Sequence, residues 1–185
     1  AGRTQPLGNC IMAKTGVMIA GLASGSGKTL ISLGLLGACV RRSLSICAAK
    51  IGPDFIDTTF LTAAGGSPAI NLDGYAMPAK ILTQLAQDLP GETMIIEGVM
   101  GLFDGGSGGV GSSAEIASTL TVPIILVLDV RHTAQTAAMV VAALNQISPG
   151  ALIAGVILNR VASKRHQALI SEALDSVGMP LVGAL

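Results

Sequence analysis

The stretch Val17-Met-Ile-Ala-Gly-Leu-Ala-Ser-Gly-Ser-Gly-Lys-Thr29 decides the fold class. Its first four residues are an apolar run typical of a buried strand, a glycine-rich loop follows, and an apolar segment with helical spacing begins at Lys28. The loop glycines let successive backbone N–H groups turn inward, and the start of the helix adds the positive end of its dipole. The stretch therefore predicts a strand, an anion-binding loop and a helix in direct succession.

The loop departs from the usual G-x-x-x-x-G-K-T pattern, because Leu22 stands at the first glycine position and Gly21 lies one residue earlier. The Gly-Ser-Gly-Lys-Thr that remains, between a strand and a helix, still predicts a P-loop. In such a loop Lys28 contacts the β- and γ-phosphate oxygens and the hydroxyl of Thr29 binds Mg²⁺. The nucleotide-binding residues predicted from the loop are Ser24, Gly25, Ser26, Gly27, Lys28, Thr29 and Leu30.

Outward from this loop, short β-branched apolar runs alternate with longer segments of helical spacing. The predicted strands are 17–20, 44–49, 93–96, 124–128 and 152–158, with a last short strand that begins at Met179. The predicted helices are 28–41, 78–88, 113–120, 133–146 and 164–177. Continuous apolar strands are typically buried on both faces, so the pattern predicts an α/β fold with a mostly parallel sheet flanked by helices on both faces.

The composition excludes several classes of partner. Lys plus Arg and Asp plus Glu both number 11, so the net charge is zero, and we expect no nucleic acid or membrane partner. The sequence contains no apolar run of about 18 residues, which a membrane span needs. Only 12% of residues are charged, against about 25% in an ordinary domain. This deficit favours a face covered by another domain or by a second copy in a homodimer.

The length predicts one domain, over residues 12–185, with residues 1–11 as leader residues before a native start at Met12. The three cysteines, Cys10, Cys39 and Cys47, have no metal-binding or redox spacing, and we expect them to be reduced and buried. A signal-peptide pattern is absent from the sequence. Both observations favour a cytoplasmic protein.

Two acidic segments follow predicted strands, at the edge where an open α/β sheet binds its ligands. Glu97 follows the strand 93–96 and begins a Gly-lined turn, where a carboxylate can hold Mg²⁺ opposite Thr29. The segment Lys50-Ile-Gly-Pro-Asp-Phe-Ile-Asp57 follows the strand 44–49. Taken alone, this segment leaves two interpretations open: a substrate and metal site, or an aspartate that caps the next helix.

Five segments, taken together and in this order, resemble the synthetase half of the cobyrinic acid a,c-diamide synthase family, whose P-loop group includes dethiobiotin synthetase. The most specific motif is Glu97-Gly-Val-Met-Gly-Leu-Phe-Asp-Gly105. The sequence departs from the family at Phe55, where Tyr is frequent, and near Gly74 and Tyr75, where an aromatic pair is frequent. The five segments are 23–29, 50–57, 71–73, 97–105 and 155–161.

The resemblance implies an ATP-dependent carbon–nitrogen ligase of cobalamin biosynthesis with a dethiobiotin synthetase-like P-loop fold. It implies that the a and c acetates of cobyrinic or hydrogenobyrinic acid are activated as acyl phosphates. Ammonia would come from glutamine through a C-terminal glutaminase domain that is absent from this chain. The implied cofactors are ATP and Mg²⁺, and the implied partners are the corrinoid and the glutaminase domain.

The resemblance also implies roles for individual residues. Two aspartates, Asp57 and Asp104, would lie near the corrinoid carboxylate or order the loops around it. The implied catalytic residues are Lys28, Asp57 and Asp104. The implied Mg²⁺ ligands are Thr29, Glu97 and Asp54, and whether Asp54 or Asp57 lies on the metal side stays open. The implied nucleotide contacts outside the P-loop are Lys50, Asn159 and Arg160. Of these, Asn159 would bind the edge of the adenine through its side-chain amide.

Two alternatives remain. The first is another member of the same synthetase group: cobyric acid synthase, a sirohydrochlorin a,c-diamide synthase or dethiobiotin synthetase. The second, from a different class, is a partitioning-type ATPase switch that couples ATP binding to a protein partner. Such ATPases place a second lysine early in the P-loop, where this sequence has Ala23, and this counts against the switch.

Overall fold

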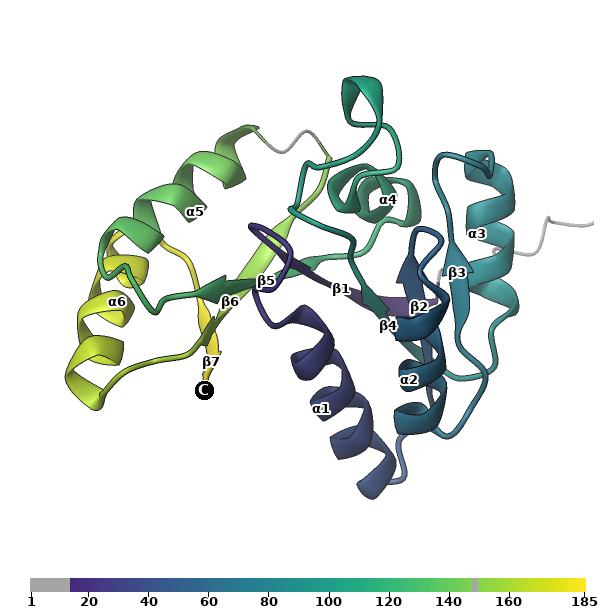
Figure 1. Ribbon diagram of the computed structural model, residues 1–185, viewed down its shortest axis with the longest axis horizontal. Coiled ribbons are helices and arrows are strands. Elements are labelled where there is room, and N and C mark those ends of the chain that lie inside the picture. The colour runs from purple at the N-terminus through teal and green to yellow at the C-terminus, as the bar shows by residue number, and fades with distance from the viewer. Residues whose placement is uncertain (1–13, 148–149) are drawn as a thin grey trace, which may run out of the picture.

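The computed structural model describes residues 14–147 and 150–185. The strands in these residues form one seven-stranded sheet, in which all neighbours are parallel, with the order β3-β2-β4-β1-β5-β6-β7 (Figure 1). The strands are β1 (Thr15–Gly21), β2 (Ile46–Ile51), β3 (Ile70–Leu72), β4 (Thr93–Glu97), β5 (Ile124–Asp129), β6 (Ile153–Asn159) and β7 (Leu181–Ala184). The helices are α1 (Lys28–Arg41), α2 (Phe55–Gly65), α3 (Ala79–Asp88), α4 (Ser113–Leu120), α5 (Thr136–Ile147), α6 (Lys164–Ser176) and the short 3₁₀ helix η1 (Ser107–Gly109).

The sheet separates two apolar cores, so helices pack on both of its faces. Residues of α1 and α2, such as Leu36 and Leu61, pack on one face against Ile19 and Val127 of the sheet. Residues of α3, α4, α5 and α6 pack on the other face, in the larger core. Each fully buried Leu or Ile side chain contributes about 1.5–3 kcal/mol to folding. The predicted α/β fold with two helical layers is confirmed.

The predicted elements lie within three residues of the observed bounds, but three elements are missing from the prediction: α2, β3 and the short η1. Helix α2 buries only Leu61 completely, while Phe55, Ile56 and Phe60 are exposed, so its sequence lacks a clear apolar stripe. Strand β3 has only three residues, too few for a visible alternation pattern. Both elements owe their structure to their place beside β2 rather than to a strong local pattern.

The parallel strands bring their carboxyl ends to the same edge of the sheet. The chain runs from β1 to β2 on one side, whereas β5 and β6 lie on the other side of β1. The strand order therefore reverses direction next to β1, and open α/β sheets bind ligands in the crevice at such a switch point. The P-loop follows β1 and so lies in this crevice.

Two of the three cysteines lie in the described residues. Cys47 is buried and Cys39 half-buried, both as free thiols. Cys10 and the leader residues 1–11 lie outside the described residues. Among residues 14–147 and 150–185, none of the helices combines the length and apolar character needed to cross a membrane.

Candidate functional site

The loop between β1 and α1 has the backbone of an anion-binding loop. Gly25 and Gly27 adopt φ angles of 77° and 101°, which are accessible to glycine without strain. A Cβ atom on Gly27 would lie 2.1 Å from Nδ2 of Asn159, so a larger residue also lacks space. No side chain caps the start of α1 at Gly27. The first N–H groups of the helix are therefore available to a phosphate.

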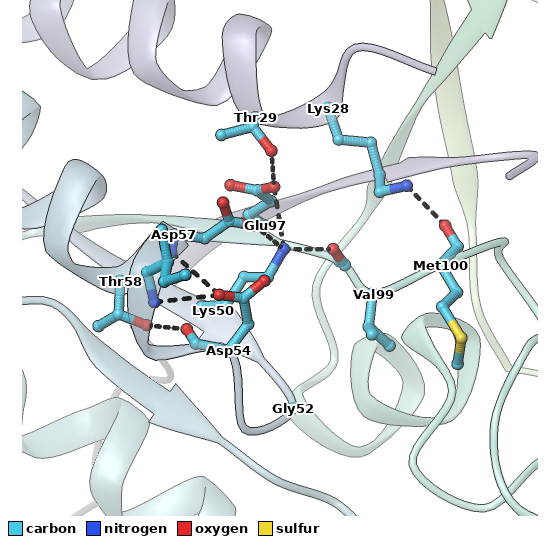
Figure 2. Close-up of polar contacts among 12 residues, drawn as sticks. Lys28, Thr29, Lys50, Gly52, Asp54, Asp57, Thr58, Glu97, Val99 and Met100 are labelled. Atoms are coloured by element: carbon cyan, nitrogen blue, oxygen red, sulfur yellow. Dashed lines mark hydrogen bonds and ion pairs between the residues drawn. The ribbon is translucent and has the colours of Figure 1, made fainter. Parts of the chain in front are cut away.

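Lys28 links this loop to the loop that follows β4. Its side chain is buried, and Nζ donates to the carbonyl oxygen of Met100 at 2.6 Å (Figure 2). Nζ also donates to the carbonyl oxygen of Ala23 at 3.0 Å. Burial and the nearby charge of Lys50 lower the pKa of Lys28. The ammonium group is thus held over the interior of the P-loop by two neutral acceptors, which a phosphate oxygen can replace.

Glu97, the last residue of β4, is a buried carboxylate beside Thr29. Its Oε1 accepts hydrogen bonds from Oγ1 of Thr29 at 2.5 Å and from Nζ of Lys50 at 3.0 Å (Figure 2). Its Oε2 is buried and has no partner among the described residues. Burial raises the pKa of Glu97, although the bonds from Thr29 and Lys50 oppose this rise. A buried carboxylate oxygen without a partner is costly, and a cation would satisfy it.

Lys50 joins the two acidic segments predicted from the sequence. Its buried Nζ lies 2.7 Å from Oδ2 of Asp57 and 3.0 Å from Oε1 of Glu97, and it also donates to the carbonyl of Gly98 at 3.3 Å. Burial favours a lower pKa for Lys50, but the bonds to Asp57 and Glu97 outweigh it and raise the pKa. Lys50 therefore stays charged and keeps the two carboxylates close together.

Asp54 caps the N-terminus of α2. Its Oδ1 accepts from the backbone N–H groups of Ile56 and Asp57, both at 3.1 Å. The bond from the N–H of Asp57 is the main reason why the pKa of Asp54 is lowered. The helix-cap interpretation of this segment is therefore confirmed. The role of Asp54 as a Mg²⁺ ligand stays a prediction, and its side chain lines the same cavity as Glu97.

Replacing Asp54 with alanine is expected to lower the free energy of unfolding by about 1 kcal/mol, because two N–H groups of the first turn of α2 lose their acceptor. Urea unfolding followed by circular dichroism measures this change. Asn at the same position is the matched control, because its side-chain oxygen can still accept both bonds. An Ala variant as stable as the unchanged protein would contradict the cap.

Asp104 orders the turn after β4. Its Oδ2 accepts from the backbone N–H of Gly101 at 2.8 Å. Gly101 itself lies against the P-loop, since a Cβ atom at this position would be 2.6 Å from the carbonyl oxygen of Leu22. The structure therefore places Asp104 where it supports the loop beside Lys28, in line with one of its two predicted roles. A direct contact with substrate stays a prediction.

Asn159 and Arg160, at the end of β6, contact the P-loop backbone. The side-chain amide of Asn159 is buried and donates to the carbonyl of Ser26 at 2.8 Å. Nη1 of Arg160 donates to the carbonyl of Gly25 at 3.1 Å and to Oδ2 of Asp129. Asn159 thus supports the P-loop, and its predicted contact with adenine remains untested. Asp129 was missed, although a carboxylate at the end of a buried strand is the same signal that identified Glu97.

Most of the predicted residues line one cavity of about 440 Å³ at the carboxyl edge of the sheet. Leu30, which is 65% exposed, does not line it, and neither do Ser26, Asp104 and Asn159. No cluster of three or more His, Cys, Asp or Glu side chains suited to a metal occurs in the described parts of the chain. The predicted residues that line the cavity are Ser24, Gly25, Gly27, Lys28, Thr29, Lys50, Asp54, Asp57, Glu97 and Arg160.

Two solved structures have folds similar to this chain. Chloroplast FtsY from Physcomitrella patens has a TM-score of 0.62 and 17% identity, covering 97% of this chain and 58% of its own. The hydrogenase maturation factor HypB from Archaeoglobus fulgidus has a TM-score of 0.57 and 15% identity, covering 92% of this chain and 81% of its own. At such low identity these structures support the fold alone, which is the predicted P-loop fold.

Curated relatives are much more similar in sequence. The hydrogenobyrinate a,c-diamide synthase of Mesorhizobium japonicum is 42% identical over 179 residues, which are 94% of this chain and 41% of the relative. The protein of the same name from Rhodobacter capsulatus is 46% identical over 175 residues, with 92% and 40% covered. The chain thus spans about two fifths of the length of these relatives.

The family resemblance drawn from the sequence is confirmed by these relatives. A family model described as the CobQ/CobB/MinD/ParA nucleotide binding domain matches residues 17–185, from β1 to the last residue. The match includes the P-loop, Glu97 and the whole cavity around them. The chain belongs to the CobQ/CobB/MinD/ParA nucleotide-binding domain family.

Proposed function

We propose that this chain is the ATP-binding part of a hydrogenobyrinate a,c-diamide synthase, which activates acetate carboxylates of a corrinoid for amidation. The observation that carries the chemistry is the single cavity in which Lys28, Thr29 and Glu97 meet, with a buried carboxylate oxygen that has no partner in the described residues. The names of relatives at 42–46% identity support the substrate class.

The proposed reaction solves a leaving-group problem. A carboxylate cannot be aminated directly, because oxide would have to leave. In the first step, an acetate oxygen attacks the γ-phosphorus of ATP, the bond to the bridging oxygen breaks, and ADP leaves. In the second step, ammonia attacks the acyl carbon and expels inorganic phosphate, which leaves the amide. The protein contributes positioning and charge stabilisation, and it forms no covalent intermediate.

The residues of the cavity, together with Asp104 in the turn after β4, can take these roles as they stand. The N–H groups from Gly25 to Thr29 would bind the β-phosphate, and Lys28 would exchange the carbonyls of Ala23 and Met100 for phosphate oxygens. Asp104 would keep the loop after β4 in place beside the reacting carboxylate. Asp57, held by Lys50, would lie at the substrate side of the cavity.

Mg²⁺ fits the oxygen donors at Thr29 and Glu97, because the free Oε2 of Glu97 and the Thr29 hydroxyl lie beside the P-loop. These two residues would hold the ion, with Asp54 as a further candidate. When bound, Mg²⁺ supplies positive charge that neutralises phosphate oxygens. Lys50 already neutralises part of the carboxylate charge in its vicinity.

The relatives extend well beyond the matched region, and we place a glutaminase domain there as the source of ammonia. We also propose a cytoplasmic location, where ATP is available and where Cys39 and Cys47 stay reduced. The exposed apolar residues of α1, Leu30 and Val40, support a covered face in the complete protein or in a homodimer.

An amidation assay tests this function. The chain is incubated with ATP, Mg²⁺, ammonium and bicarbonate, and with hydrogenobyrinic acid, cobyrinic acid, nickel sirohydrochlorin or diaminopelargonic acid in turn. Mass spectrometry is expected to show ATP-dependent amides of the corrinoid acids. Turnover of only one of the other two compounds would favour another synthetase of the group. ATP hydrolysis that responds to a protein or DNA partner, but to none of the four carboxylates, would favour a switch.

A further inference from the structure

The cavity of about 440 Å³ that Lys28, Thr29 and Glu97 line is called the phosphate cavity, or first cavity, below. A second cavity lies next to it, at the opposite flank of the P-loop. Its volume is about 390 Å³. β4 contributes Glu97 to the first cavity, β5 contributes Asp129 to the second, and β1 with its P-loop lies between these strands. Both cavities are lined by Ser24 and Gly25, so they meet at the tip of the P-loop. One large ligand can therefore occupy both.

Arg131, which lines the second cavity, and Arg160, which lines the first, place an excess of positive charge around Asp129, where the two cavities meet. Arg131 donates to Asp129 through Nε, to Oδ1 and to Oδ2 at 3.1 Å, and through Nη2 at 2.8 Å. Arg160 also forms an ion pair with Asp129, so two guanidinium groups share one carboxylate. The hydrogen bonds from Arg131 lower the pKa of Asp129 to about 2. The three groups together carry a net positive charge, and His132 beside them is exposed.

Arg131 has binding capacity left for an anion. Its side chain is 54% exposed, and Nη1 has no hydrogen-bond partner in the part of the chain that the structure describes. The Nε and Nη2 side of the guanidinium faces Asp129, which fixes its plane. The remaining N–H groups can bind a second carboxylate with little loss of side-chain entropy.

The wall that carries Arg131 is fixed by a contact with α6. The ring of His166 accepts from the N–H of Ala162 through Nδ1 at 3.2 Å. Nε2 therefore carries the proton and donates to the carbonyl of Thr133 at 2.7 Å. This bond ties the turn after β5, which carries Arg131, to the N-terminal part of α6.

We propose that this second cavity is a substrate subsite, in which Arg131 binds a carboxylate arm of the corrinoid that is not reacting. The inference rests on the proposed function. During the first of the two amidations, the second acetate is still charged while the first meets ATP. Arg131 can hold such a charged arm while the reacting acetate lies near Lys28, on the other side of Ser24 and Gly25. The subsite thus fixes the macrocycle relative to the P-loop.

Equilibrium binding without turnover tests the subsite. The chain is saturated with Mg²⁺ and a non-hydrolysable ATP analogue, and hydrogenobyrinic acid is titrated with absorbance as readout. Arg131→Gln is expected to weaken corrinoid binding about tenfold, since one charge-assisted hydrogen-bond pair is lost. Arg42→Gln, at the exposed C-terminal end of α1, is the matched control and is expected to bind as the unchanged protein does. Affinity for the nucleotide analogue is expected to stay the same in both variants.

A second ligand separates charge recognition from packing. With the methyl ester of hydrogenobyrinic acid, in which the carboxylates are blocked, Arg131→Gln and the unchanged protein are expected to bind equally. An equal loss for acid and ester, a loss of nucleotide affinity, or no loss for the acid would each overturn the subsite while the proposed function stands. Failure of the unchanged protein to bind hydrogenobyrinic acid would overturn the proposed function, and the subsite with it.

Discussion

Replacing Lys28 with methionine is expected to lower the rate of ATP-dependent amidation by about a thousandfold. The ammonium group of Lys28 is the buried cation closest to the interior of the P-loop, where it contacts the carbonyls of Ala23 and Met100. Methionine preserves the apolar stem but removes the charge that would stabilise the transferring phosphoryl group. The rate constant for amide formation at saturating ATP, Mg²⁺ and ammonium measures the effect.

A matched variant shows whether this loss is specific. Lys80→Met removes the same charge from an exposed position on α3 and is expected to leave the rate unchanged. Circular dichroism and thermal unfolding establish that both variants are folded. Amide formation by folded Lys28→Met at the rate of the unchanged protein would exclude the P-loop as the site of phosphoryl transfer.

Replacing Glu97 with glutamine is expected to raise the Mg²⁺ concentration required for half-maximal nucleotide binding by about a hundredfold. The amide keeps the shape of the side chain and one acceptor for Thr29, but it loses the charge and the free carboxylate oxygen. Lys50 retains Asp57 as an ion-pair partner, so the variant is expected to fold. Titration of a fluorescent ATP analogue at a series of Mg²⁺ concentrations measures the shift.

Glu172→Gln serves as the control for this variant, because Glu172 is exposed on α6 and far along the chain from the P-loop. Its Mg²⁺ requirement is expected to match that of the unchanged protein. If Glu97→Gln required no more Mg²⁺ than this control, Glu97 would not be a ligand of the ion. Lys50 and Asp57 would then form a purely structural ion-pair network with Glu97.

The features that could be predicted from the sequence follow from local residue patterns and from general rules of parallel sheets. The P-loop and α1 are encoded by adjacent residues, and the helix begins at Lys28 as expected. Glu97 could be placed opposite Thr29 because parallel strands end at the same edge of a sheet, and the two side chains are 2.5 Å apart. Alternating strands and helices were enough to predict the two-layer packing around the sheet.

Other features depend on side chains that meet only after folding. Lys50 lies between Asp57 and Glu97 because β2 and β4 are neighbours, and their register pairs Lys50 with Glu97. Asn159 reaches Ser26 across 133 positions of sequence. The pairing of Arg131 with Asp129 and Arg160 depends in the same way on β5 and β6 being adjacent. Nothing in the local pattern of these segments specifies their partners.

The transfer of the γ-phosphoryl group to a corrinoid acetate is tested most directly by isotope transfer. Hydrogenobyrinic acid with carboxylates enriched in a heavy oxygen isotope is incubated with the chain, ATP, Mg²⁺ and ammonium. The inorganic phosphate is then analysed by phosphorus NMR. Each phosphate released with an amide is expected to carry an oxygen from the acid, because the acyl C–O bond breaks when ammonia attacks. Amide formed with phosphate free of the label would contradict this transfer.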